Sequence, residues 1–236
     1  MRQLLEDVLI VYRQEADNLL TIVAPAAVLG PVFVIVSASA PLAALAAVPV
    51  LLLLYLATYA TCVRAAGAIL RNVSPEPGRA FLDVLLSAPA VLLIAAAPFI
   101  LLTVVMCSAL FVAEQGFAPV AAAMGLLGLG AALHWASQHP YDYSLLLAFD
   151  VGADDAVRAG SRLAIVARRD TLRLLGLLAL PLTLVSLIAL WAGVALGQPA
   201  GAGIFLVALA LWIPLPALVL TFGCDRLVSE PATQLP

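Results

Sequence analysis

Lysine is absent from this chain of 236 residues, and charged side chains make up only 11% of it. Soluble globular proteins are about a quarter charged and about half apolar, whereas the apolar fraction here is 64%. A soluble core cannot hide so many apolar side chains, so lipid must surround much of the surface. The sequence therefore predicts an all-α, polytopic membrane protein in which residues 1–236 form a single integral membrane domain.

The residue types that usually carry catalysis or metal binding are also scarce. The three cysteines, Cys62, Cys107 and Cys224, have no metal-ligand spacing. No phosphate-binding loop, serine nucleophile motif or zinc-protease motif is present. The net charge of −3 gives no reason to expect a nucleic-acid partner. We therefore expect no catalytic residues, no metal, no cofactor and no nucleic acid.

Long apolar runs separated by short turns predict six transmembrane helices arranged as three hairpins. A run of about 20 apolar residues is long enough to cross the hydrocarbon core. The predicted spans are residues 19–40, 43–63, 84–112, 117–136 with a continuation toward 149, 174–196 and 204–223. We expect the fourth span to bend or end near Pro140, because the proline ring blocks the helical hydrogen bond to Ala136.

Two charged segments have the periodicity of amphipathic helices. In residues 1–18 and 154–173, polar side chains recur every three to four positions opposite an apolar face. Such helices lie along a membrane surface. Each leads into a span that carries a proline in its first third, and a shorter lead precedes the third span. This layout predicts a threefold internal repeat, which either common ancestry or convergence explains.

The arginines predict the orientation of the chain. All 11 basic residues lie in the N-terminal segment, the second and fourth connections with their flanks, and the C-terminal tail. The turns near residues 41, 114 and 200 contain none. Because basic residues stay on the cytoplasmic side, both termini are expected in the cytoplasm, with the chain in a bacterial cytoplasmic membrane.

Two groups of polar residues are candidate sites. The first contains the arginines of segment 154–173, as an anionic-lipid contact or simply a topology anchor: Arg158, Arg162, Arg168, Arg169 and Arg173. The second surrounds Pro140, as a small polar pocket or an interfacial belt of aromatic and solvated side chains: His134, His139, Tyr141 and Asp142.

The chain resembles a known family in three stretches. These are Tyr12-Arg13, the segment from Ala156 to Leu163, and the run from Leu174 to Leu178. They are similar to a bacterial integral-membrane family that includes the membrane domain fused to some glycerophosphodiester phosphodiesterases and its stand-alone relatives. The resemblance implies six spans with cytoplasmic termini. It does not imply phosphodiesterase activity, which resides in a separate soluble domain, and Arg162 stands where relatives often carry an aromatic residue.

The function predicted from these features is that of a non-enzymatic membrane protein. It would act as a scaffold, an accessory subunit or a lipid-associated module, with membrane lipids and a membrane protein as partners. The alternatives are a transporter or channel-like component for an uncharged or lipidic solute and, third, a membrane-embedded lipid enzyme. The span centres contain no Asp, Glu, Lys or Arg, which disfavours an ion-coupled pump.

Overall fold

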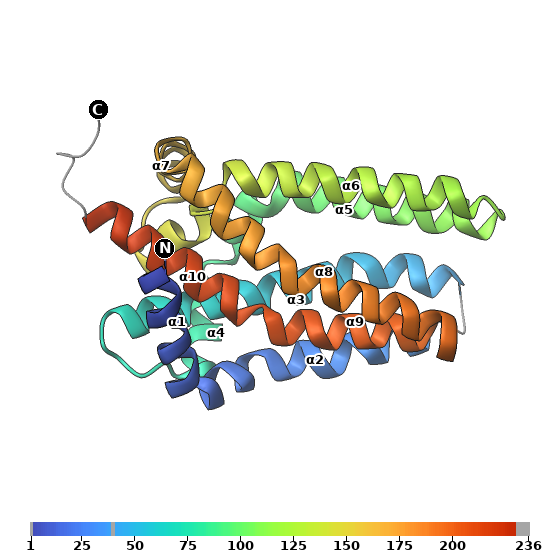
Figure 1. Cartoon of the computed structure of the whole chain (residues 1–236), viewed down its shortest axis with the longest axis horizontal. Coiled ribbons are helices and arrows are strands. Elements are labelled where there is room, and N and C mark those ends of the chain that lie inside the picture. The colour runs from blue at the N-terminus through green and yellow to red at the C-terminus, as the bar shows by residue number, and fades with distance from the viewer. Residues whose placement is uncertain (1, 39–40, 230–236) are drawn as a thin grey trace.

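The computed structural model describes residues 2–38 and 41–229, and within these ranges every regular element is a helix (Figure 1). The elements in chain order are α1 (Arg2–Gln14), α2 (Ala16–Ala38), α3 (Pro41–Leu70), α4 (Pro77–Leu86), α5 (Ala88–Glu114), α6 (Ala118–Gln138), the π-helix η1 (Ser144–Ala148), α7 (Ala153–Val166), α8 (Arg168–Leu196), α9 (Gln198–Trp212) and α10 (Pro214–Ser229). The predicted all-helical fold is confirmed.

Within the described residues, five stretches are long and apolar enough to cross a membrane. They are Ala16–Ile35, Ala47–Leu70, Ala88–Ala109, Arg168–Leu196 and Gln198–Ser229. Large apolar side chains on these helices are exposed, among them Val194 at 83% and Trp191 at 72%. Exposed apolar surface on this scale requires lipid as the solvent, and a multi-pass membrane protein is the result.

Prolines divide two of the predicted spans. The predicted span 84–112 is interrupted at Ser87, between α4 and α5, where Pro89 has no N–H to continue the helical ladder. The predicted span 204–223 is divided at Ile213, just before Pro214. The predicted second span, 43–63, continues without a break to Leu70.

The fourth predicted span ends where Pro140 predicts. Helix α6 stops at Gln138, and residues 139–143 turn the chain before η1 begins. The expected end near Pro140 is confirmed, and the helix does not continue to residue 149.

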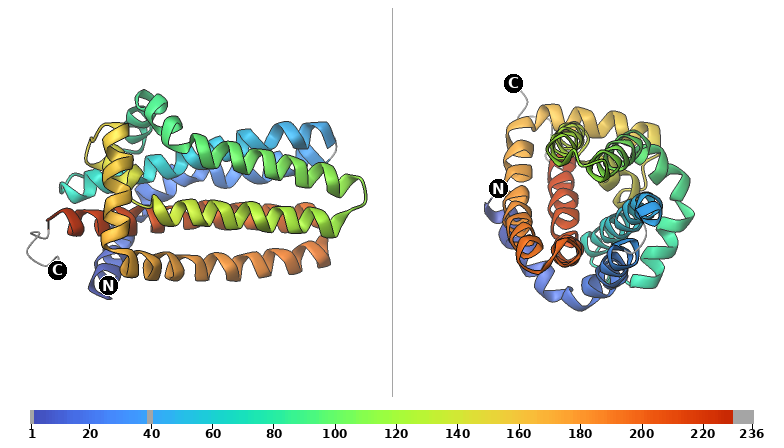
Figure 2. Two further views of the ribbon diagram at one scale, coloured as in Figure 1. Left: turned by 90° about the horizontal axis from the view of Figure 1, so that it is seen from above. Right: turned by 90° about the vertical axis from the view of Figure 1, so that its right-hand side faces the viewer.

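The arginine-rich segment 154–173 is two helices rather than one. Helix α7 ends at Val166, Ala167 leaves the helical conformation, and α8 begins at Arg168. Figure 2 shows α7 lying across the long axis that α8 follows, so the chain must change direction between them. Arg168, Arg169 and Arg173 therefore belong to α8. Ala167 is neither proline nor glycine, so no helix-breaking residue marks this bend.

The helices are arranged with approximate threefold regularity. The pairs α2–α3, α5–α6 and α8–α9 pack within themselves, and the end-on view places them around a common axis (Figure 2). Helices α1, α4 and α7 lie across one end of the bundle, which we call the arginine end (Figure 1). Each pair is thus preceded in the chain by one of the short helices at the arginine end.

The densest core of the described chain lies at the arginine end. Val8 of α1, Val63 of α3 and Leu218 of α10 are fully buried in one cluster together with the segment that follows α6. Toward the opposite end, side chains of α5 such as Ile100 and Val104 are largely exposed. The arginine end is therefore the part of the molecule in which side chains are most tightly positioned.

Candidate functional site

The chain between α6 and α7 returns into the bundle, and we call residues 139–150 the inserted segment. Every residue from 141 to 148 is buried. The π-helix η1 at its centre packs against α3, α7 and α10. Gly67 of α3 permits this approach, because a Cβ there would lie 2.7 Å from the Cα of Ala148. π-Helical turns are often found at functional sites, and this one lies in the core.

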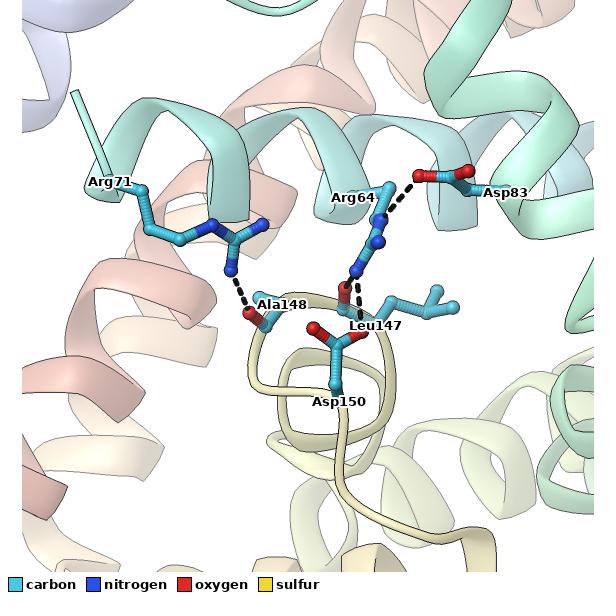
Figure 3. Close-up of polar contacts among 6 residues, drawn as sticks. All are labelled: Arg64, Arg71, Asp83, Leu147, Ala148 and Asp150. Carbon is cyan, nitrogen blue, oxygen red and sulfur yellow. Dashed lines mark hydrogen bonds and ion pairs between the residues drawn. The ribbon is translucent and has the colours of Figure 1, made fainter. Parts of the chain in front are cut away.

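Arg64 of α3 and Arg71, the residue that directly follows α3, hold the end of the inserted segment (Figure 3). Arg71 Nη1 donates to the carbonyl oxygen of Ala148 at 2.7 Å. Arg64 Nη1 donates to the carbonyl oxygen of Leu147 at 2.7 Å and to Asp150 Oδ1 at 2.6 Å. The last carbonyl groups of a helix have no partner within it, so the guanidinium groups supply the missing donors.

Arg64 also ties the inserted segment to α4. Its Nε donates to Asp83 Oδ2 at 3.0 Å (Figure 3). Asp150, on the other side of the guanidinium, has a φ of 56°, a left-handed conformation that aspartate and asparagine tolerate better than most residues. A single side chain therefore links α3, α4 and the inserted segment. The charge of Arg64 predicted only the topology of the chain, and these contacts were not predicted from the sequence.

Two members of the predicted polar pocket meet inside the arginine end. Asp142 is fully buried, and its Oδ2 lies 3.0 Å from His139 Nδ1. Among the described residues, Asp142 Oδ1 has no hydrogen-bond partner. It faces Gly160 of α7, where a Cβ would collide with it. The indole of Trp135 stacks on the His139 ring, with centroids 4.8 Å apart.

Burial favours the neutral forms of this pair. It raises the pKa of Asp142 to about 7 and lowers the pKa of His139. Both pKa shifts fit a protonated Asp142 carboxyl that donates its O–H to Nδ1 of a neutral His139 imidazole. The pair therefore holds a proton near neutral pH, with the carboxyl fully buried and the His139 ring partly exposed.

The other members of the predicted pocket lie elsewhere. Tyr141 is buried, but its hydroxyl is 2.9 Å from Thr171 Oγ1 of α8. His134 is on an exposed part of α6, with its Nε2 3.1 Å from Gln138 Nε2. Tyr143 packs edge-on against Tyr59 of α3. The structure thus brings His139 and Asp142 together and uses Tyr141 to fasten the inserted segment to α8.

The predicted lipid-contact arginines lie on two helices. Helix α7 buries its small residues Ala156, Gly160 and Ala164 and leaves Arg158 and Arg162 exposed. These two arginines line a groove of about 520 Å³. Its apolar lining is formed by Leu145, Leu163, Val166 and Val228 of the inserted segment, α7 and α10. We call this the α7 groove.

The remaining arginines of this set lie on the first turns of α8. Arg168 and Arg169 are exposed, and Arg173 lies 3.6 Å from Asp170. An exposed pair at that distance contributes little to stability. Of these five arginines, Arg158 and Arg162 line the α7 groove, whereas the other three do not line it.

No protein-family model, no curated protein and no solved structure matches this chain. Within residues 2–38 and 41–229, no three histidine, cysteine or acidic side chains gather as metal ligands.

Proposed function

We propose that this protein binds anionic lipid at the arginine end and acts as a non-enzymatic, lipid-associated module or scaffold in a bacterial cytoplasmic membrane. The observation that supports the proposal is the α7 groove. Arg158 and Arg162 stand there beside Leu163, Val166 and Val228. A site that offers cations next to apolar side chains suits a molecule with a charged headgroup and a hydrocarbon chain.

The electrostatics of the groove fit the same ligand. Among the described residues, neither Arg158 nor Arg162 forms an ion pair, although Asp155 also lines the groove. Each basic side chain near an anionic membrane surface contributes about 1 kcal/mol to binding. Two unpaired guanidinium groups therefore give the groove a preference for anionic over zwitterionic headgroups.

The first test is retention of lipid by a double variant. Replacing Arg158 and Arg162 with glutamine should cost about 2 kcal/mol, or roughly thirtyfold in affinity for phosphatidylglycerol over phosphatidylcholine. The measurement is mass spectrometry of lipid that co-purifies with the full chain in one detergent. The double variant Arg168→Gln, Arg169→Gln is the control, because it removes the same charge outside the groove. Equal retention by the two variants would refute the proposal.

We further propose six spans, with α6 as the fourth, and both termini in the cytoplasm. Helix α6 has 21 residues, which is a spanning length, and packs against α5. The arginines of α1, α4, α7 and α8 then lie on the cytoplasmic side. This topology is the one implied by the resemblance to the membrane family of the phosphodiesterase fusions, and membership of that family is part of the proposal.

Reporter fusions test this topology. Fusions after Ser74 and after Gly152 should report the cytoplasm, whereas fusions after Gln115 and after Pro199 should report the outside. The reason is that the connections containing Ser74 and Gly152 have arginines around them, whereas those containing Gln115 and Pro199 do not. An outside signal at Gly152 would show that α6 does not cross the membrane. The helices that follow would then cross it in the opposite direction.

A further inference from the structure

A second cavity lies at the arginine end, between α3 and α4. Its volume is about 330 Å³. The polar part of its lining is formed by Arg64, Arg71, Ser74, Glu76, Arg79 and Asp83. Because these residues belong to α3, α4 and the connection between them, this α3–α4 cavity is separate from the α7 groove, and its ligand does not depend on the function proposed for that groove.

The three arginines of the cavity differ in how much of their hydrogen-bonding capacity is used. Arg64 is committed to Asp83, Asp150 and Leu147. Arg71 gives its Nη1 to Ala148 and leaves its other guanidinium nitrogens without a partner among the described residues. Arg79 is exposed and has no hydrogen bond or ion pair within the described chain. Two guanidinium groups can therefore still donate to a ligand.

The backbone adds donors to the same cavity. The N-cap of α4, Glu76, makes no side-chain hydrogen bond to the helix. The first N–H groups of a helix have no partner within it. Pro77 has none to offer, and of the next two residues only Arg79 lines this cavity, because Gly78 lines a different one. Ser74 contributes a hydroxyl. An uncapped helix N-terminus beside two arginines is suited to an anion with several acceptor oxygens.

The carboxylates of the cavity leave a net positive charge. Asp83 is neutralised by Arg64 at 3.0 Å. Glu76 is exposed and lines the same cavity as Arg71 and Arg79. It forms an ion pair with neither of them in the described chain. Glu76 therefore weakens an anion site without abolishing it.

We propose that the α3–α4 cavity binds a phosphate group, with Arg71 and Arg79 as its cationic ligands. The group belongs either to a lipid headgroup or to a soluble phosphate compound. A separate apolar groove of about 190 Å³, which shares no lining residue with the cavity but is also formed by α3 and α4, favours the lipid. It is lined by residues of α3, α4 and α5, including Leu53, Phe81, Leu85 and Leu92.

Binding to the purified full chain in detergent tests this site. The probes are inorganic phosphate, followed by thermal shift, and short-chain phosphatidic acid, followed by retention on the protein. Arg79→Gln should weaken binding about tenfold, because one charge-assisted hydrogen bond is lost. Glu76→Gln should strengthen it about threefold, because a nearby like charge is removed. Arg79 makes no hydrogen bond or ion pair within the described protein, so its replacement should leave folding unchanged.

The double variant Arg158→Gln, Arg162→Gln is the matched control, since it alters only the α7 groove. Arg79-dependent binding of phosphatidic acid alone identifies a lipid site. Arg79-dependent binding of inorganic phosphate identifies a site for soluble phosphate compounds as well. The proposal requires at least one probe to bind more weakly to Arg79→Gln, and more strongly to Glu76→Gln, than to the wild type. If neither probe does so, the proposal is wrong, whatever the control variant shows at the α7 groove.

Discussion

Replacing Arg64 with glutamine is expected to destabilise the protein more than any other single arginine replacement. The guanidinium joins Asp83 of α4, Asp150 and the carbonyl of Leu147. Its loss leaves a buried carbonyl and two carboxylates without their donor. Removing one partner of a fully buried ion pair costs about 3 to 5 kcal/mol. The side chains of Arg64, Asp83 and Asp150 are 23%, 33% and 67% exposed, so we expect about 2 kcal/mol.

Thermal unfolding in one detergent measures this effect. Arg168→Gln is the control, because Arg168 is exposed and has no partner in the described chain. Asp150→Asn separates charge from backbone, since asparagine retains the left-handed conformation and loses only the ion pair. It should cost less than Arg64→Gln. A melting temperature for Arg64→Gln equal to that of Arg168→Gln would show that Arg64 does not fasten the inserted segment.

The second large effect is a pH dependence that comes from Asp142. Burial raises its folded-state pKa from 3.8 to about 7. Between these values the folded state keeps a proton that the unfolded state has lost, so rising pH favours unfolding. Relative to Asp142→Asn, the wild type should lose up to about 4 kcal/mol as the pH rises from about 4 to about 7. Above that window the difference should stay constant.

His139 acts in the opposite direction. Burial lowers its pKa, so below about pH 6.5 the unfolded state binds the proton that the folded state excludes, and its contribution to stability rises with pH. Comparing the wild type with Asp142→Asn at each pH removes this common term. Asparagine has the same shape and can still donate to His139 Nδ1. If the melting temperatures of the two proteins changed equally with pH between pH 4 and pH 8, this result would contradict the buried, protonated carboxyl.

Hydropathy and proline positions predicted most of the helical framework. The first predicted span, 19–40, corresponds to α2, whose bounds are Ala16–Ala38; residues 39–40 lie outside the described residues. Pro140 correctly marked the end of α6. These features are local. The length of an apolar run and the missing N–H of a proline each depend on residues that are close together in the sequence. Boundaries shifted where tertiary packing decides them, as at Ala167 and Leu70.

The interactions of the site could not be read from the sequence in the same way. Asp83 and Asp150 meet Arg64 from positions 19 and 86 residues away, and no periodicity reports such pairing. The run from Ser144 to Phe149 has the composition of a span, yet it is a buried π-helical turn. One signal was available, since Arg64 and Arg71 are seven residues apart, the first in the last two turns of α3 and the second just after its end. It indicates a common target but not the carbonyl groups of residues 147 and 148.

The packing of α10 determines when the inserted segment can be buried during synthesis of the chain. This last helix contacts α1, α3 and η1, and Thr221 lies 3.2 Å from Ser144. Arg226 reaches back to Asp7 at 2.6 Å, across 219 residues of sequence. The earlier helices can enter the membrane as they emerge from the ribosome. The inserted segment, however, has no finished surroundings until residues 214–229 have been made, so its burial is a late and long-range event in the maturation of the protein.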